Sequence, residues 1–228
     1  MIIKSFNKDY LEYLVPQRTR LLTEYAIKDE SSSEDICGSL TKMMNRDYEM
    51  ILPFLPVRAN NILDIGCGIG LIDAALFNHY DNNVSLHLLD KTNSIEKGTN
   101  VGGFKNEYVF YNSLDATRDV LESNGVNGDR IFTYEVSEEA LQSLSNVQYD
   151  IIISLLSCGW HYPIKTYVDL IKKTLKPNGV LILDIRHNTG QLEYIQTEFN
   201  LIQSVENTAE SKHTGGTIGD RHIFETKK

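Results

Sequence analysis

The sequence has little cysteine and no long apolar run. Its three cysteines, Cys37, Cys67 and Cys158, stand far apart and show no metal-like pairing. No stretch approaches the ~18 consecutive apolar residues that a membrane span requires, and the residues after Met1 lack the architecture of a signal peptide. These absences predict reduced thiols, a cytoplasmic protein and no membrane association.

Basic clusters are also missing. The chain carries 22 lysines and arginines against 31 aspartates and glutamates, for a formal net charge of −9. Its longest basic runs are Lys172-Lys173 and Lys227-Lys228, whereas proteins that bind nucleic acid usually present a basic surface. Nucleic acid is therefore an unfavoured partner. No metal is expected either, because the spacing of four histidines matches no metal site. These histidines are His79, His87, His213 and His222.

The remaining composition is that of an ordinary globular protein. Hydrophobic residues make up 41% of the 228 residues and charged residues 23%, as is typical of such domains. Before residue 58, apolar side chains recur at helical spacing until Pro53 and Pro56 interrupt the pattern. We expect residues 1–57 to form an N-terminal helical cap and residues 58–228 to form the main domain.

A glycine-rich stretch at residues 61–70 is the most specific feature of the sequence. An apolar run leads into Asp64, and Gly66, Gly68 and Gly70 follow at every second position before an apolar helical pattern begins at Leu71. A strand, a glycine-rich turn and a helix in this order are typical of a nucleotide-binding α/β unit. Glycines let the backbone approach a ligand, and the first turn of the helix directs unpaired N–H groups toward it.

The spacing Asp-x-Gly-x-Gly-x-Gly resembles the first motif of class I S-adenosylmethionine-dependent methyltransferases. It differs from the Gly-x-Gly-x-x-Gly spacing of dinucleotide-binding enzymes. The resemblance covers residues 58–228 and implies S-adenosyl-L-methionine as cofactor, with S-adenosyl-L-homocysteine as product. It places Asp64 in the network that holds the methionine part of the cofactor. It also implies that the cofactor contacts Gly66, Gly68, Gly70 and the backbone of Cys67.

Further apolar runs predict the strands of a doubly wound α/β fold. They lie at residues 84–90, 130–136, 149–157, 180–184, 201–205 and 221–226, with helical patterns between most of them. A turn at residues 176–179 should precede the fifth strand, as in many of the methyltransferases that the chain resembles. The prediction is a mainly parallel, seven-stranded, Rossmann-like sheet with an antiparallel C-terminal strand and an N-terminal helical lid.

Other candidate cofactor residues lie in or just beyond the predicted strands. Asp90 ends the second run, where an acid can accept hydrogen bonds from both ribose hydroxyls, and Lys91 follows it. The resemblance places Glu135 and Val136 beside the adenine. Ser154, in the fourth run, completes the set of candidate cofactor contacts.

The segments after the fourth and fifth strands supply the candidate catalytic residues. Methyl transfer needs a nucleophile held near the methyl group, and a hydroxyl or ammonium acceptor must also lose a proton. His161 is the first candidate for general base and His187 the alternative, because histidine titrates near neutral pH. His161 could instead bond a backbone carbonyl and hold its loop. The candidate substrate contacts are Arg18, Tyr111, Trp160, Tyr162 and Arg186, and Asn112 is a further residue that could touch cofactor or substrate.

The expected function is transfer of a methyl group to an oxygen or nitrogen of a small polar molecule, such as a sugar, sugar nucleotide or metabolite. The loop after the fourth strand lacks the Asn/Asp-Pro-Pro-Tyr/Phe box of DNA methyltransferases, which disfavours methylation of a base amino group. Two alternatives stay open. One is methylation of a protein or an RNA, and the other is a non-catalytic relative that binds the cofactor. No oligomeric state is favoured.

Overall fold

A computed structural model describes residues 1–14, 31–92, 104, 112–206 and 218–227. Its centre is a seven-stranded sheet with the strand order β3-β2-β1-β4-β5-β7-β6. The strands are β1 (Asn61–Ile65), β2 (Ser85–Asp90), β3 (Ile131–Glu135), β4 (Tyr149–Ser154), β5 (Leu175–Arg186), β6 (Phe199–Glu206) and β7 (Gly219–Thr226). Strands β1 to β5 run parallel, and β7 pairs antiparallel with both β5 and β6. The predicted mainly parallel sheet with an antiparallel C-terminal strand is confirmed.

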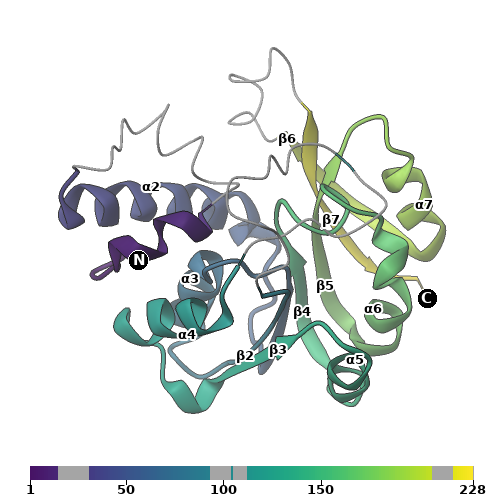
Figure 1. Ribbon diagram of the computed structural model, residues 1–228. Helices are drawn as coiled ribbons and strands as arrows, with labels where there is room; N and C mark the ends of the chain where they lie inside the picture. The colour runs from purple at the N-terminus through teal and green to yellow at the C-terminus, as the bar shows by residue number, and fades with distance from the viewer. Residues whose placement is uncertain (15–30, 93–103, 105–111, 207–217, 228) are drawn as a thin grey trace.

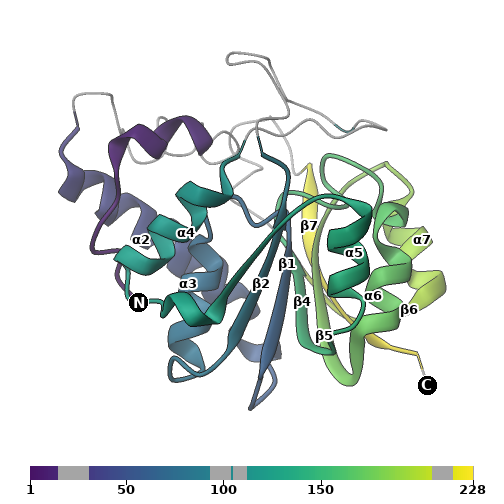
Figure 2. The same cartoon turned by 60° about the horizontal axis from the view of Figure 1, so that its bottom comes forward.

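Helices cover both faces of this sheet. In the described ranges they are η1 (Lys8–Tyr13), α2 (Ser33–Ile51), η2 (Leu52–Phe54), α3 (Leu71–His79), α4 (Leu114–Ser123), η3 (Gly128–Arg130), α5 (Glu138–Leu144), η4 (Ile164–Thr166), α6 (Val168–Thr174) and α7 (Gln191–Glu198). Helices α2, α3 and α4 lie on one face, and α5, α6 and α7 lie on the other (Figures 1 and 2). None of the described helices is long and apolar enough to cross a membrane.

Alternate side chains of the central strands enter two separate apolar clusters. In β4, Ile151 and Ile153 join the cluster under α2, α3 and α4, whereas Ile152 joins the cluster under α5, α6 and α7. Successive side chains of a strand point to opposite faces, so a strand covered on both sides reads as a nearly continuous apolar run. This pattern explains why the run in β4 could be recognised from sequence.

The N-terminal segment packs on the same core as the sheet. A capping box begins α2: Oγ of Ser32 accepts from the backbone N–H of Asp35, and the Asp35 carboxylate accepts from that of Ser32. From α2, Leu40 and Met44 enter the apolar cluster that contains residues of β1 and α3. The expected helical cap is thus described in part, by η1 and α2, and its boundary at residue 57 stays a prediction.

The turn expected at residues 176–179 was wrong. These residues lie inside β5, which begins at Leu175, and the preceding helix ends at Thr174. The ladder between β4 and β5 shifts its register between Tyr149 and Ile151, so the four residues bulge from regular pairing. Pairing with β4 on both sides of the bulge decides the strand assignment, although the bulge itself contains ordinary turn residues.

Candidate functional site

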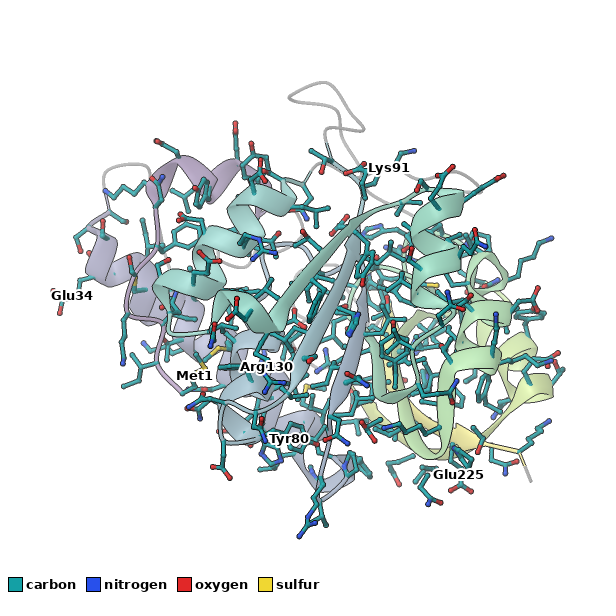
Figure 3. The ribbon with its side chains drawn as sticks, turned by 90° about the horizontal axis from the view of Figure 1, so that it is seen from below. Met1, Glu34, Tyr80, Lys91, Arg130 and Glu225 are labelled. Carbon is teal, nitrogen blue, oxygen red and sulfur yellow. The ribbon has the colours of Figure 1, made fainter. Side chains whose placement is uncertain are left out.

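A cavity lies at the carboxyl ends of the parallel strands. Its walls come from the ends of β1 and β2 and from the segment after β4, and residues of η1 and α2 also line it. Figure 3 shows Lys91, just beyond β2, at this end of the sheet, with Tyr80 and Arg130 toward the opposite end. The strand order reverses between β1 and β4, and doubly wound sheets bind their ligands at such a reversal.

Hydrogen bonds from β2 hold the glycine loop that follows β1. The backbone N–H of Gly66 donates to the carbonyl of Leu89 at 2.7 Å, and that of Gly68 donates to Oδ2 of Asp90 at 2.8 Å. Gly66 has a φ of +81°, and a Cβ at this position would lie 1.8 Å from Oγ of Ser157. Only glycine fits here, because the loop after β4 packs directly against this backbone.

Asp90 connects three segments of the site. Its Oδ1 accepts from the backbone N–H of Lys91 at 2.7 Å, and its Oδ2 accepts from Gly68 and from Nδ2 of Asn112 at 2.9 Å. Asn112 also donates to the carbonyl of Gly68 at 3.0 Å. Burial raises the pKa of Asp90 to about 6, and its hydrogen bonds with these three donors oppose the rise. Oδ1 retains a lone pair that can accept from a bound ligand.

Two buried oxygens of the cavity residues have no hydrogen-bond partner in the described part of the chain. They are Oδ1 of Asp64 and Oδ1 of Asn112, and these side chains belong to residues that are 2% and 3% exposed. A buried acceptor without a partner costs about 1–3 kcal/mol. The cavity is therefore suited to a ligand that brings hydroxyl or ammonium donors.

A second carboxyl group lies behind Asp64. Asp73, in the first turn of α3, is fully buried and interacts electrostatically with Asp64, but it is not among the residues that line the cavity. Burial and the charge of Asp73 raise the pKa of Asp64 well above its ordinary value. Burial also raises the pKa of Asp73, to about 7. The pair thus differs from two independent, ionised carboxylates.

The end of β4 is tied to the end of β1. Oγ of Ser154, a predicted cofactor contact, donates to the carbonyl of Ile65 at 2.6 Å and accepts from the backbone N–H of Cys158 at 2.9 Å. Beyond it, Oγ of Ser157 and the hydroxyl of Tyr162 lie 3.0 Å apart in a hydrogen bond. Ser157 lines the cavity, whereas Tyr162 is buried behind it.

The other candidate residues after β4 and β5 lie outside the described cavity lining. Nε2 of His187 bonds Oδ2 of Asp220 at 2.9 Å. Nε of Arg186 donates to the carbonyl of Trp160 at 3.1 Å, and its guanidinium lies 5.3 Å from the centre of that indole ring. The backbone N–H of His161 donates to the carbonyl of Ser157, in the cavity wall, at 2.9 Å. The structure thus places Arg186 against Trp160, and it places His161 next to the cavity wall.

The residues predicted beside the adenine hold β3 against β2. The Glu135 carboxylate accepts from the backbone N–H of Thr92 at 2.9 and 3.0 Å, and the N–H of Val136 donates to the carbonyl of Asp90 at 3.0 Å. Glu135, Val136 and Lys91 are not among the described lining residues. Arg18 and Tyr111 lie outside the described part of the chain.

Sequence reasoning missed the cavity wall that the cap supplies. This wall consists of Tyr13, Met43, Met44 and Asp47. Asp47 follows Met43 by four positions and Met44 by three, so the three residues share one helix face. A carboxylate on an otherwise apolar helix face was the available signal. The same signal applies to Asp73, which stands between Ile72 and Ala74 in α3.

No family model and no curated protein matches the sequence, but solved structures match the fold. A precorrin-6y C5,15-methyltransferase from Geobacter metallireducens GS-15 is 14% identical and covers 82% of this chain and 89% of its own, with a TM-score of 0.51. An rRNA methylase from Streptococcus thermophilus is 14% identical and covers 80% of this chain and 95% of its own, with a TM-score of 0.53. The StiE O-MT is 12% identical and covers 92% of this chain and 81% of its own, with a TM-score of 0.55. The chain therefore has the fold of class I S-adenosylmethionine-dependent methyltransferases.

Proposed function

We propose that this chain binds S-adenosyl-L-methionine at the carboxyl ends of β1 and β2 and transfers its methyl group to an oxygen or nitrogen of a small polar molecule. The proposal rests on the cavity in which Asp64, the glycine loop and Asp90 converge. The cavity lies at the strand-order reversal of a methyltransferase fold, where ligands of doubly wound sheets bind.

The residues of the cavity fit this cofactor. Oδ1 of Asp64 and Oδ1 of Asn112 need donors, and the cofactor carries an ammonium group, two ribose hydroxyls and an adenine amino group. Asp90 accepts one backbone donor at Oδ1 and keeps capacity there for a hydroxyl. We assign Asp64 to the methionine part and Asp90, with Asn112 beside it, to the ribose.

The proposed chemistry makes few demands on the chain. When bound, the cofactor supplies a methyl group on a positively charged sulfur, and the carbon–sulfur bond breaks as the acceptor attacks. The residues of the site must bind the reactants, hold them at near-attack distance and exclude water. Met43 and Met44 give the cap wall an apolar surface that excludes water, and Asp47 adds a carboxylate that is paired with Arg221.

We propose His161 as the general base for a hydroxyl acceptor. Its loop supplies the cavity wall at Ser157, whereas the imidazole of His187 bonds Asp220 on β7. A histidine at this position can accept the proton that an attacking hydroxyl loses.

The net charge supports a small-molecule acceptor. With a charge of −9, the chain repels a polyanion over long range. The described cavity lining contains no lysine, arginine or histidine. The fold alone does not select this acceptor, because an rRNA methylase shares it. The acceptor assay therefore includes RNA and protein as alternative methyl acceptors.

Calorimetric titration tests cofactor binding. S-adenosylmethionine and S-adenosylhomocysteine are titrated into the wild type, Asp90→Ala and Asp129→Ala. Asp129 is exposed and belongs to η3, near Arg130 and away from the cavity. We expect Asp90→Ala to bind at least about tenfold more weakly, because a hydrogen bond to a charged group contributes ~1.5–3 kcal/mol. Asp129→Ala should bind as the wild type does. A folded wild type that binds neither ligand would contradict the proposal.

A second assay identifies the acceptor class. Cofactor with a labelled methyl group is offered with pools of small hydroxyl and amine compounds, with RNA and with protein. Label on a small compound supports the proposal. Label on RNA or protein alone would favour the alternatives, and cofactor binding without transfer to any pool would favour a non-catalytic protein.

A further inference from the structure

The Asp64 and Asp73 carboxyls are buried together in the protein interior. Asp64 lies in β1, one residue before its end, and Asp73 lies in the first turn of α3; the two residues are 2% and 0% exposed. Ionised carboxylates only accept hydrogen bonds, so a bond between two of them exists only if one carries a proton. Without that proton, Oδ1 of Asp64 and both oxygens of Asp73 have no partner among the described residues. One shared proton would give the pair a hydrogen bond and would remove the repulsion of two buried charges.

The surroundings of the pair are acidic. Asp90 adds negative charge beside Asp64 from β2, and no lysine, arginine or histidine of the described chain is among the groups that act on either carboxyl. The Cys67 thiol faces the same group of acids, and burial and their charges raise its pKa, which keeps it neutral. Across the cavity, Asp47 is paired with Arg221. Within the described part of the chain no cation balances the pair, which leaves it suited to a ligand that carries one.

We propose that Asp73 is a positioning residue for the cofactor. It shares one proton with Asp64, so that the pair offers a single net negative charge to the ammonium group of the cofactor's methionine part. This inference rests on the proposed function and adds a residue to it. A single shared charge matches one ammonium, whereas two ionised carboxylates at this depth would add a large desolvation cost.

Proton linkage follows from this arrangement. An ammonium group next to the pair favours its deprotonated form, so cofactor binding releases part of a proton near neutral pH. An asparagine at position 73 keeps the shape of the side chain and removes the Asp73 charge, which is one of the causes that raise the pKa of Asp64. The variant therefore holds less of a proton near neutral pH and releases less of one. The amino group of the cofactor also titrates, but it does so equally with every variant and cancels in the comparison.

The experiment counts protons. S-adenosylmethionine is titrated into the wild type, Asp73→Asn and Asp115→Asn between pH 6 and 8, in pairs of buffers with different ionisation heats. Asp115 is a matched control, because it is an exposed acid in the first turn of α4. We expect the wild type and Asp115→Asn to release the same number of protons and Asp73→Asn to release fewer. Relative to Asp73→Asn, wild-type affinity should rise up to about tenfold across this range, as a one-unit change in the pKa of the pair requires. Equal proton counts for the wild type and Asp73→Asn would overturn the proposal.

A measurement on the free protein separates this inference from the proposed function. Carboxyl ¹³C resonances should show, besides Asp90, one aspartate that titrates near neutral pH in the wild type and is absent from Asp73→Asn, or from Asp73→Ser if the first variant does not fold. A wild type without such a group overturns proton sharing, whatever the cofactor does. A wild type that shows the titration but binds no cofactor instead overturns the proposed function, and the cofactor role of Asp73 with it.

Discussion

Arg221 on β7 and Asp184 on β5 form a buried ion pair with two hydrogen bonds, Nε to Oδ1 at 2.7 Å and Nη2 to Oδ2 at 3.0 Å. The same guanidinium donates to the carboxylate of Asp47 at 3.2 Å and to its backbone carbonyl at 3.1 Å. Oδ2 of Asp184 also accepts from the backbone N–H of Leu156 at 3.2 Å, in the cavity wall. Arg221 thus holds the cap helix directly, and it holds the segment after β4 through Asp184.

Arg221→Met should destabilise the protein strongly. Removing the guanidinium leaves Asp184, which is 0% exposed, as an unpaired buried charge, at a cost of ~3–5 kcal/mol. Asp47→Asn should cost less, about 1 kcal/mol or below, because this carboxylate is partly exposed to water. Urea unfolding at pH 7 measures both. Equal losses for the two variants would show that the Asp184 pair does not dominate.

Gly66→Ala should abolish cofactor binding and lower stability. Its Cβ would lie 1.8 Å from Oγ of Ser157, and its φ of +81° disfavours any side chain, so we expect a loss of at least ~1–3 kcal/mol. Gly38→Ala is the matched control. Gly38 lies inside α2, and no neighbouring group of the described chain comes within 4 Å of the place that a Cβ would occupy, so alanine should stabilise the helix by ~0.5–1 kcal/mol. In thermal unfolding, the midpoint should fall for Gly66→Ala and rise for Gly38→Ala.

Acid should destabilise the protein through His87. Burial against Phe132 and Tyr134 lowers the pKa of His87 to about 4. The folded value lies below the unfolded value of about 6.5, so this contribution is complete above pH 6.5 and is lost as the pH falls toward 4, by up to ~3 kcal/mol. His87→Phe should lose less stability than the wild type between pH 7 and pH 4.5 in urea unfolding. Parallel losses would exclude His87 as a source of acid sensitivity.

Asn112 variants test a contact between the glycine loop and Asp90. Asn112→Ala removes the donor that joins Gly68 to Asp90, and we expect S-adenosylhomocysteine to bind about tenfold more weakly, since each such bond contributes ~1 kcal/mol. Asn112→Asp should bind more weakly still, because it sets a second carboxylate against Asp90. Asn146→Ala, at an exposed site after α5, should leave calorimetric affinity unchanged. Unaltered binding by both Asn112 variants would remove this residue from the site.

His161→Asn should slow the reaction without weakening the cofactor. Loss of a general base lowers kcat by ~10²–10⁴-fold, while the calorimetric Kd for S-adenosylmethionine stays at the wild-type value. His187→Asn should change kcat only a few-fold, because His187 bonds Asp220 outside the described cavity lining. These rates are measured with the acceptor that the labelling assay identifies. The reverse order of effects would transfer the role to His187.

Patterns within a few residues of one another were readable from the sequence. The strand, glycine loop and helix around residues 61–70 follow from apolar periodicity and from positions that only glycine tolerates, such as Gly66 beside Ser157. The run in β4 could be recognised because both faces of that strand are buried. The prediction of a turn at residues 176–179 was wrong because it depended on a distant partner: pairing with β4 on both sides makes these residues part of β5.

The sequence by itself determined the class of sheet, the glycine loop and the acid at the end of β2, because each depends on local spacing. Only the tertiary structure decided how the buried charges pair. Asp64 meets Asp73 through the packing of α3 on β1, and Asp184 meets Arg221 across two antiparallel strands, 37 residues further along the chain. Such partners depend on distances in space, and the low dielectric of the interior makes each pairing decisive for charge and stability.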